Sequence, residues 1–293
     1  MQLSKYGLWT IALDQQPAPA AKEAAAEIES LGFGAIWIPE AVGREAMASS
    51  MLLLSGTSSI VVATGIANLY ARDAMSMSAG HKTITSAYPD RFLLGIGVSH
   101  QVAVESLRGH DYGKPLTTMR GYLDAMDAAL YFAAPPPVEP VRVLAALGPK
   151  MLELARDRAS GAHPYFVPIE HTSIARDVLG AGKLLCPEQA VVLETDPDAA
   201  RTIARAHMRS YLGLPNYTNN LRRLGWGDDD LGDGGSDRLV DAIVAWGSTD
   251  AVVARINDHL DAGADHVAIQ VLDADPRGLP MAQWRELGSA LGL

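Results

Sequence analysis

Four short groups of residues in this sequence have side chains that could carry chemistry, and each group follows an apolar run that predicts a buried strand. They are Pro39-Glu40, Gly65-Ile66-Ala67-Asn68, Gly97-Val98-Ser99-His100 and Leu147-Gly148-Pro149-Lys150-Met151. The set is poor in charge for a hydrolase. It suits a flat, partly apolar ring that carries an anionic tail. We take the last three groups without His100 as the candidate cofactor-binding set, and His100 and Glu40 as the candidate catalytic residues.

The fourth group is the predicted site for the anionic tail. A helix that starts after Gly148 can present free backbone N–H groups, and Lys150 adds a positive charge beside them. That combination favours a phosphate. The alternative is that Lys150 is only a solvated helix residue.

Several familiar motifs fail, and their failure excludes function classes. Gly95-Ile96-Gly97 begins like a dinucleotide fingerprint, but His100 stands where the third glycine would be. Gly148-Pro149-Lys150 lacks the remaining residues of a phosphate-binding P-loop. The first predicted strand does not end in the His-x-His of metal-dependent barrel hydrolases, and the sequence has no Gly-x-Ser-x-Gly elbow.

A recurring joint organises the elements that must position these residues. An Ala-rich amphipathic segment ends at a glycine and passes into a short apolar strand three times, at Gly32, Gly161 and Gly263. Each glycine can supply a left-handed helix cap, and the strand after it has the composition of one buried on both faces. Three such joints predict a βα repeat.

Eight strand candidates follow from this repeat. They are Tyr6 to Ile11, Ala35 to Ile38, Ile60 to Ile66, Phe92 to Gly97, Val141 to Ala146, Ala162 to Val167, Ala190 to Glu194 and His266 to Val271. Eight strands predict an α/β fold, a (β/α)₈ TIM barrel, whose chemistry lies where the strands end. Asp196 and Ser248 are predicted N-caps of two of the intervening helices.

The repeat is interrupted between the seventh and eighth strands. Residues from about 214 to 238 hold too many turn residues and charges for one helix, so we predict an insertion with one short helix and an exposed acidic loop. Residues 1–293 are otherwise expected to form a single barrel domain.

Three other polar residues on the predicted strands carry weaker signals. His163 and Tyr165 alternate along the sixth strand, which would aim both into the barrel mouth or pack both inside it. Glu194 ends the seventh strand, and the sequence does not decide between a functional and a solvated carboxylate.

Composition and net charge limit where the protein can reside in the cell and what it can bind. The net charge of −10 argues against a basic footprint for nucleic acid, and no apolar run is long enough to span a bilayer. Cys186 is the only cysteine, which excludes an intrachain disulfide framework and suits a reducing cytosol. The first residues lack the succession of a signal peptide. We expect a cytoplasmic protein that acts on a small molecule.

Longer stretches carry a family resemblance that covers nearly the whole chain. The segments ATGIANLYARDAMSMSAGHKTI, PDRFLLGIGVSHQV, VRVLAALGPKMLELARDRASGAHPYFV and AGADHVAIQV, in this order, resemble the luciferase-like monooxygenase superfamily. They are most similar to its actinobacterial branch that uses the deazaflavin coenzyme F420. The order and spacing of these segments supply the specificity, because each motif alone is loose.

The resemblance implies a barrel whose redox ring lies against a bulge at the end of the third strand, with a non-proline cis peptide at Gly65-Ile66. Glu40 falls where relatives often carry aspartate. Ala41 falls where F420-dependent alcohol and sugar-phosphate dehydrogenases carry a histidine base, and alanine cannot abstract a proton. His100 takes the place of a glutamate near the ring in some relatives, and imidazole can hold or release a proton near neutral pH.

These implications define the leading hypothesis, an F420-dependent oxidoreductase that moves a hydride between the deazaflavin and a small organic substrate. His100 would donate or relay a proton and Glu40 would shape the pocket. The alternatives are an FMN-dependent monooxygenase of the same superfamily, and a cofactor-binding protein that has lost catalysis. Luciferase-like barrels usually pair, so we also expect a homodimer.

Overall fold

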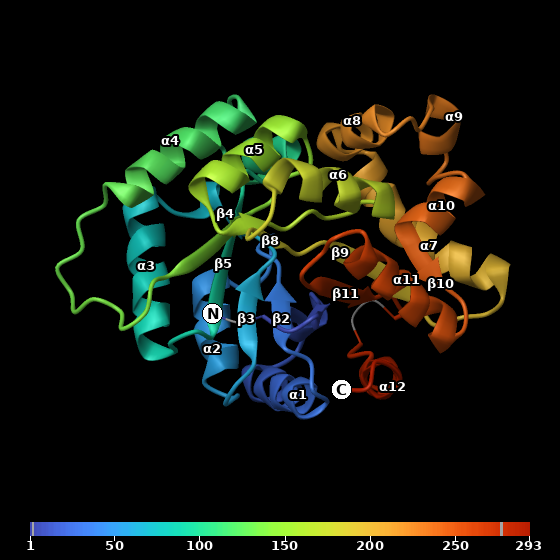
Figure 1. Ribbon diagram of the computed structural model, residues 1–293, viewed down its shortest axis with the longest axis horizontal. Coiled ribbons are helices and arrows are strands. Elements are labelled where there is room, and N and C mark those ends of the chain that lie inside the picture. The colour runs from blue at the N-terminus through green and yellow to red at the C-terminus, as the bar shows by residue number, and fades with distance from the viewer. Residues whose placement is uncertain (2, 276–277) are drawn as a thin grey trace.

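Parallel strands form the centre of the molecule, and the computed structural model describes them within residues 1, 3–275 and 278–293 (Figure 1). Their short apolar runs form strands because each is buried on both faces. The strands are β1 (Tyr6–Trp9), β2 (Ala35–Ile38), β3 (Val61–Thr64), β4 (Ala67–Asn68), β5 (Phe92–Gly97), β6 (Val141–Leu144), β7 (Gly161–Ala162), β8 (Leu184–Leu185), β9 (Glu188–Val192), β10 (Val244–Trp246) and β11 (Val267–Val271).

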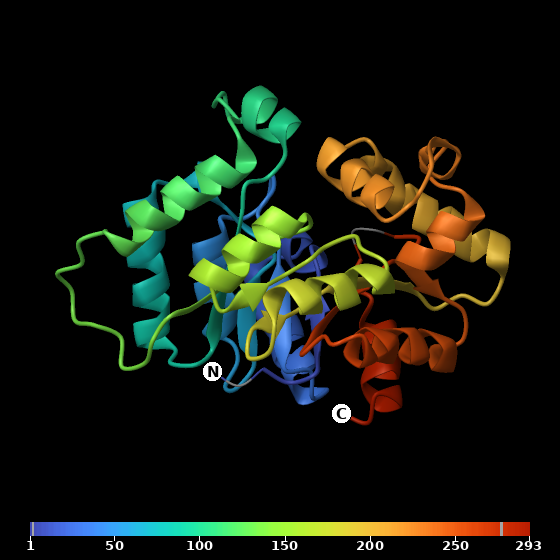
Figure 2. The same cartoon turned by 45° about the horizontal axis from the view of Figure 1, so that its top comes forward.

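Helices follow the strands and cover the outside of the sheet (Figures 1 and 2). The α-helices are α1 (Ala18–Ser30), α2 (Ala46–Leu54), α3 (Ala74–Ala87), α4 (Pro115–Asp127), α5 (Pro149–Arg158), α6 (Ile169–Leu179), α7 (Pro197–Leu212), α8 (Pro215–Arg223), α9 (Asp228–Leu231), α10 (Asp237–Ile243), α11 (Thr249–Asp261) and α12 (Met281–Ala290). Short helical turns are η1 (Ala12–Gln15), η2 (Leu69–Ala71) and η3 (Ala103–Leu107).

The strand pairing follows the path of a TIM barrel. All pairs are parallel, and the order runs β9-β11-β1-β2-β3-β5-β6-β7-β8. β8 and β9 are separated only by Cys186 and Pro187, so one extended segment contacts β7 at its start and β11 along its length. The predicted (β/α)₈ fold is confirmed, and each of the eight predicted strands has a counterpart.

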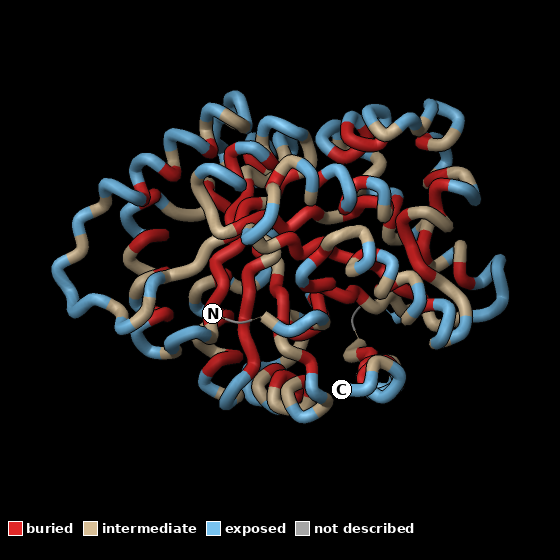
Figure 3. The backbone as a smooth tube through the Cα atoms, viewed as in Figure 1, coloured by how far each residue is buried: buried red, intermediate tan, exposed pale blue. Residues whose placement is uncertain are grey.

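The strands consist mostly of buried residues (Figure 3), whose side chains form clusters on both sides of the sheet. One cluster fills the barrel interior with residues from alternate strand positions, among them Trp9, Trp37, Leu93, Cys186 and Ala268. A larger aliphatic cluster lies between the strands and the helices. The mouth-facing residues are therefore the upper layer of a packed interior.

Local sequence signals confirm most of the predicted joints. Gly32 and Gly263 adopt φ of 89° and 103°, which an L-residue rarely adopts. Asp196 and Ser248 accept hydrogen bonds from the N–H groups of Ala199 and Ala251 as N-caps. The prediction for Gly161 is wrong, because this residue lies in β7. A Cβ atom there would be 1.9 Å from the carbonyl oxygen of Leu184, so the glycine permits close strand approach.

Three other predictions need correction. The sixth strand is shorter than predicted, because the chain leaves the ladder after Ala162 and Phe166 turns into the left-handed region with φ of 58°. β10, which pairs with β9, was missed. The insertion carries two short helices, α8 and α9, and its acidic residues 228–230 form α9 instead of a loop. The insertion lies between the seventh and eighth barrel strands, as predicted.

No helix in the described part of the chain is both long and apolar enough to cross a bilayer. The same residues contain no group of three or more His, Cys, Asp or Glu side chains placed to hold a metal ion.

Candidate functional site

The carboxyl ends of the strands bring the predicted groups together at one end of the barrel. β4 pairs with β5, which sets Ala67 beside Ile96 and Asn68 beside Gly97. The N–H of Asn68 donates to Glu40, 2.8 Å away. A Cβ atom added to Gly97 would lie 2.6 Å from the Ile66 side chain and 3.3 Å from Ala145, at the end of the next strand.

The bulge after β3 has the form that the family resemblance implied. The peptide bond between Gly65 and Ile66 is cis, which confirms that prediction. The indole Nε1 of Trp9 donates to the carbonyl oxygen of Gly65 at 3.1 Å and fixes the first residue of the bulge. Ile66, Val98 and Ser99 are half-buried. Together they form a partly apolar platform that a planar ring could cover.

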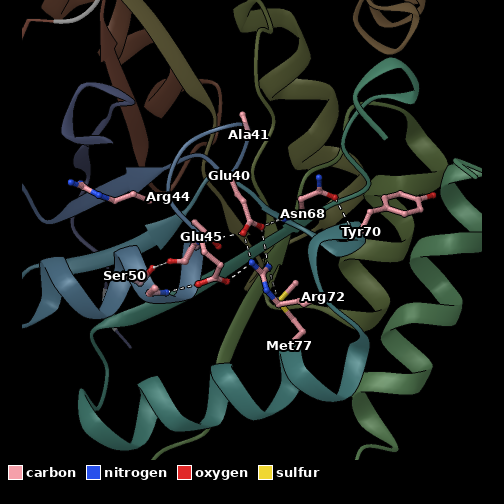
Figure 4. Close-up of polar contacts among 12 residues, drawn as sticks. Glu40, Ala41, Arg44, Glu45, Ser50, Asn68, Tyr70, Arg72 and Met77 are labelled. Atoms are coloured by element: carbon pink, nitrogen blue, oxygen red, sulfur yellow. Dashed lines mark hydrogen bonds and ion pairs between the residues drawn. The ribbon is translucent and has the colours of Figure 1, made fainter. Parts of the chain in front are cut away.

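Glu40 is buried and held by a network of polar contacts that includes Glu45, Asn68 and Arg72 (Figure 4). Its carboxylate accepts from the N–H groups of Ala46 and Asn68 and from the guanidinium of Arg72, which also pairs with Glu45. The Glu40 and Arg72 side chains are only 4% and 10% exposed. Burial lowers the pKa of Arg72, but the hydrogen bonds and charges of Glu40 and Glu45 outweigh it and raise the pKa. Oε2 of Glu40 therefore anchors the bulge at Asn68, and Oε1 contacts the start of α2 at Ala46.

His100 lies between the barrel and the insertion. Its Nδ1 is 3.2 Å from Oδ1 of Asn216, and its ring centroid is 5.5 Å from that of Tyr217 in α8. Burial lowers the pKa of His100, and the hydrogen bond to Asn216 offsets this only in part. The neutral imidazole therefore dominates near pH 7, with Nδ1–H donating to Asn216 and Nε2 available to accept a proton.

The predicted tail site contains a cation that sequence reasoning missed. Lys150 is exposed at the start of α5. Met151 N–H already donates to the Gly148 carbonyl and Pro149 has no N–H, so the helix start offers fewer free amides than predicted. Arg223 from the insertion lies over this turn, because its Nη2 would be 3.3 Å from a Cβ atom on Gly148. Nothing in the spacing of Arg223 along the chain signals this.

An aromatic cluster surrounds one carboxyl group near His100 and Trp9. The hydroxyl of Tyr165 donates to Oε1 of Gln270 at 2.8 Å and lies 2.8 Å from the hydroxyl of Tyr211. Tyr217 packs against both tyrosine rings, with centroid separations of 6.3 and 5.2 Å. Tyr165 lies past the end of β7, so the predicted strand alternation does not reach it, and its side chain is half-buried.

Glu188, the first residue of β9, lies under these tyrosines and is 2% exposed. Oε2 accepts from the Phe166 N–H at 3.1 Å, and Oε1 has no hydrogen-bond partner among the described residues. Burial raises the pKa of Glu188 to about 8, and the Phe166 hydrogen bond lowers it only in part. The carboxyl group is therefore mostly protonated near pH 7. Sequence analysis did not single out Glu188.

His163 and Glu194, the other two polar residues considered in the sequence analysis, make structural contacts. His163 is buried, stacks on Trp37 at 4.3 Å, and its Nδ1 is 2.7 Å from the carbonyl oxygen of Cys186. Burial lowers the pKa of His163 to about 4, so its ring is neutral in the barrel interior. Glu194 accepts from the N–H of Asp196 in the turn before α7.

Comparisons with known sequences agree with the resemblance. The luciferase-like monooxygenase family model matches residues 4–266. A 5,10-methylenetetrahydromethanopterin reductase of Methanolobus tindarius is 27% identical over 82% of this chain and 86% of its own length. A putative coenzyme F420-dependent oxidoreductase of Mycobacterium tuberculosis is 25% identical over 68% of this chain and 69% of its own length.

Solved structures share the fold. An F420-dependent secondary alcohol dehydrogenase in complex with an F420-acetone adduct has a TM-score of 0.78 at 12% identity and covers 98% of this chain and 97% of its own. The oxygenating constituent of 3,6-diketocamphane monooxygenase from Pseudomonas putida, in complex with FMN, has a TM-score of 0.66 at 18% identity, with the same coverage. At these identities the likeness shows the fold alone.

Proposed function

The chain belongs to the luciferase-like monooxygenase family of enzymes, and from this premise we propose that it is an F420-dependent oxidoreductase acting on a small organic substrate. The observation that carries the proposal is the half-buried platform of Ile66, Val98 and Ser99, which lies beside a strand-end turn overlaid by Arg223. A flat ring on the platform and an anionic tail at that turn match the two parts of a deazaflavin coenzyme.

The residues present fit such a group. Gly97 leaves the space that the Ile66 side chain occupies, so the surface beside the bulge stays flat. Gly65 to Asn68, Gly97 to Ser99 and the turn from Leu147 to Met151 would hold the coenzyme, with Arg223 and Lys150 near its tail. When bound, the coenzyme supplies two-electron hydride chemistry, and the protein supplies binding, orientation and protons.

The direction that this site supports is reduction of a carbonyl or an activated double bond. Ala41 has no proton-accepting group, so the histidine-assisted oxidation of an alcohol lacks its base. His100 would relay protons through Nε2 while Asn216 fixes its tautomer through Nδ1. Glu40 would position the bulge through Asn68 and Arg72 without taking part in proton transfer.

A side-by-side fluorescence titration with F420 and FMN tests the proposal. We expect F420 to bind at least tenfold more tightly, because the tail turn carries two side-chain cations for a tail more anionic than a single phosphate. Equal or reversed affinities would replace F420 by FMN and make the enzyme a flavin-dependent monooxygenase. Tight F420 binding without any substrate-dependent spectral change would favour a non-catalytic binding protein.

The proposal extends to assembly and location. The contacts of Asn216 and Arg223 with the barrel support one domain that includes the insertion. We propose a homodimer on the family resemblance, although Met77 and Ile84 of α3 face the barrel and only Met75 presents a large apolar side chain outward. A monomer in light scattering at micromolar concentration would remove that part. The single, buried Cys186 suits a cytoplasmic enzyme.

A further inference from the structure

The tyrosine cluster contains a directed chain of hydrogen bonds. The amide oxygen of Gln270 can only accept, so the Tyr165 hydroxyl must donate to it. The oxygen of Tyr165 then accepts from the hydroxyl of Tyr211. A proton donated by Tyr165 can therefore be replaced from Tyr211.

This chain ends beside the bulge. The ring of Tyr165 is 5.2 Å from that of Trp9, and Trp9 donates to the Gly65 carbonyl. Tyr165 is half-buried at the mouth, whereas Glu188 is buried behind it. A molecule at the mouth can therefore contact Tyr165 but not Glu188.

The acceptor that Tyr165 now uses indicates what it could bind. Gln270 offers a neutral carbonyl oxygen at 2.8 Å. A substrate carbonyl oxygen is the same kind of acceptor and could take this place. Hydride addition to the carbonyl carbon puts negative charge on that oxygen, so a hydroxyl donor there would bind the transition state more tightly than the ground state.

Among the residues that the structure describes, no cation pairs with the carboxyl group behind the tyrosines. The titratable groups that face it are Tyr165 after β7, Tyr211 and His207 of α7 and Tyr217 of α8. Burial raises the pKa values of the tyrosines and lowers that of His207 to about 4, so all four are neutral near pH 7. Cys186, two residues before Glu188, is buried and has a raised pKa. A neutral Glu188 keeps the pocket free of negative charge, and an ionised one would repel an oxyanion.

We propose that Tyr165, supported by Tyr211 and Glu188, forms an oxyanion pocket that makes this enzyme a reductase of small aldehydes and ketones. Tyr165 is the catalytic residue, and Tyr211 and Glu188 are positioning residues. This inference rests on the proposed function, because the hydride and its electron pair come from a reduced deazaflavin.

The step balances as a two-electron reduction. A C–H bond forms at the carbonyl carbon, the C=O π bond breaks, and its electron pair moves to oxygen. Tyr165 gives its proton to that oxygen, Tyr211 gives its proton to Tyr165, and solvent restores Tyr211. The relay role proposed for His100 lies on the coenzyme side of the site, where its Nε2 can accept the proton that the coenzyme releases. The substrate becomes an alcohol and the deazaflavin is oxidised by two electrons. A neutral carboxylic acid beside a tyrosine hydroxyl is an effective arrangement for stabilising such an oxygen.

The test uses 2,4-dinitrophenolate, an aromatic oxyanion that is ionised throughout the pH range used and whose visible absorbance reports binding to the full chain. We expect the wild-type affinity to fall up to about tenfold between about pH 7 and about pH 9, because Glu188, with a pKa of about 8, goes from mostly protonated to mostly ionised. Glu188→Gln should abolish that fall. Tyr165→Phe should weaken binding about tenfold at pH 7.

Control variants distinguish probe binding at this pocket from binding elsewhere on the protein and from loss of folding. Tyr6→Phe removes a tyrosine hydroxyl that donates to Asn257 at the opposite end of the barrel, and should bind the probe as the wild type does. If Tyr165→Phe does not fold, Tyr211→Phe replaces it with the same expectation. A wild-type protein that does not bind millimolar probe, or a Glu188→Gln variant with the wild-type pH profile, would overturn the inference. Titrating F420 with the same preparations keeps its failure distinct from that of the proposed function.

Discussion

Two buried glutamates lie at the mouth of this barrel, and their surroundings differ. Glu40, after β2, has both oxygens occupied by Arg72 and two backbone amides. Glu188, in β9, has one amide partner and three tyrosines around it. An ion pair and amides hold one carboxylate in a rigid support, whereas burial, with no cation beside it in the described part of the chain, keeps the other protonated. Glutamate thus has two roles here. Glu40 anchors one half of the mouth as an ion-paired carboxylate, and Glu188 is a protonated carboxyl group in the other half.

The largest expected effect comes from His100, which contacts Asn216 and Tyr217 of α8. His100→Gln keeps a hydrogen-bonding group but cannot titrate near neutral pH. Turnover should fall about 10² to 10⁴-fold while the F420 dissociation constant stays nearly unchanged, because general acid–base catalysis typically contributes this much. The rate profile should lose a group titrating below the usual histidine range.

The exposed His110 on the following loop provides a matched control for His100. His110→Gln should leave rate and pH profile as in the wild type. A wild-type rate in His100→Gln, once a substrate is in hand, would reduce His100 to a packing residue.

Arg72→Met removes the ion pair of Glu40 and so tests the first half of the mouth. Glu40 would then be a buried charge without its cation, and the free energy of unfolding should fall by about 3 to 5 kcal/mol in urea denaturation. Arg222→Met is the control, since its pair with Asp228 has side chains 50% and 85% exposed and should contribute about 0 to 1 kcal/mol. Similar losses in the two variants would show that burial does not distinguish these ion pairs.

The protonated half is tested by Glu188→Gln. The pKa of Glu188 is raised in the folded state to about 8, so between its unfolded value near 4.3 and about 8 the folded state binds more protons than the unfolded one. Wild-type stability should therefore fall as pH rises through this window, and the variant should lack this contribution. We expect the variant to gain about 2 to 4 kcal/mol relative to the wild type between about pH 4.5 and pH 8, by urea denaturation at each pH.

A second substitution separates titration from hydrogen bonding. Glu188→Met should also lose the pH-dependent term but should be less stable than Glu188→Gln at every pH, because the Phe166 N–H loses its acceptor. A constant difference between wild type and Glu188→Gln across the window would mean that Glu188 is ionised in the folded protein.

The smallest effect concerns the tail turn, where the insertion meets the barrel. Arg223→Gln should weaken F420 binding by about 1 to 3 kcal/mol, because its guanidinium lies over Gly148 and can form charge-assisted hydrogen bonds there. Lys150→Ala should cost less than about 1 kcal/mol, because Lys150 is exposed. Fluorescence titration gives the loss of F420 binding free energy for each variant. A larger loss for Lys150→Ala than for Arg223→Gln would show that Lys150 binds the tail and Arg223 does not.

The sequence by itself determined the features that depend on neighbouring residues. Gly32 and Gly263 end helices because the next turn needs a positive φ, and Asp196 and Ser248 begin helices by accepting hydrogen bonds three residues on. Apolar runs between such signals located all eight barrel strands. The ordered family segments located the bulge at Gly65-Ile66.

Only the tertiary structure decided which polar groups meet and which stay charged. Tyr165 and Gln270 are 105 positions apart, and they meet because β11 closes the barrel against β9 and β1. Periodicity shows which face of a strand a residue occupies but not which strand lies opposite, so Gly161 was mistaken for a helix cap and Arg223 went unnoticed. Glu188 is a charged residue in its sequence context, and burial without a cation, which depends on four separate segments, is what protonates it.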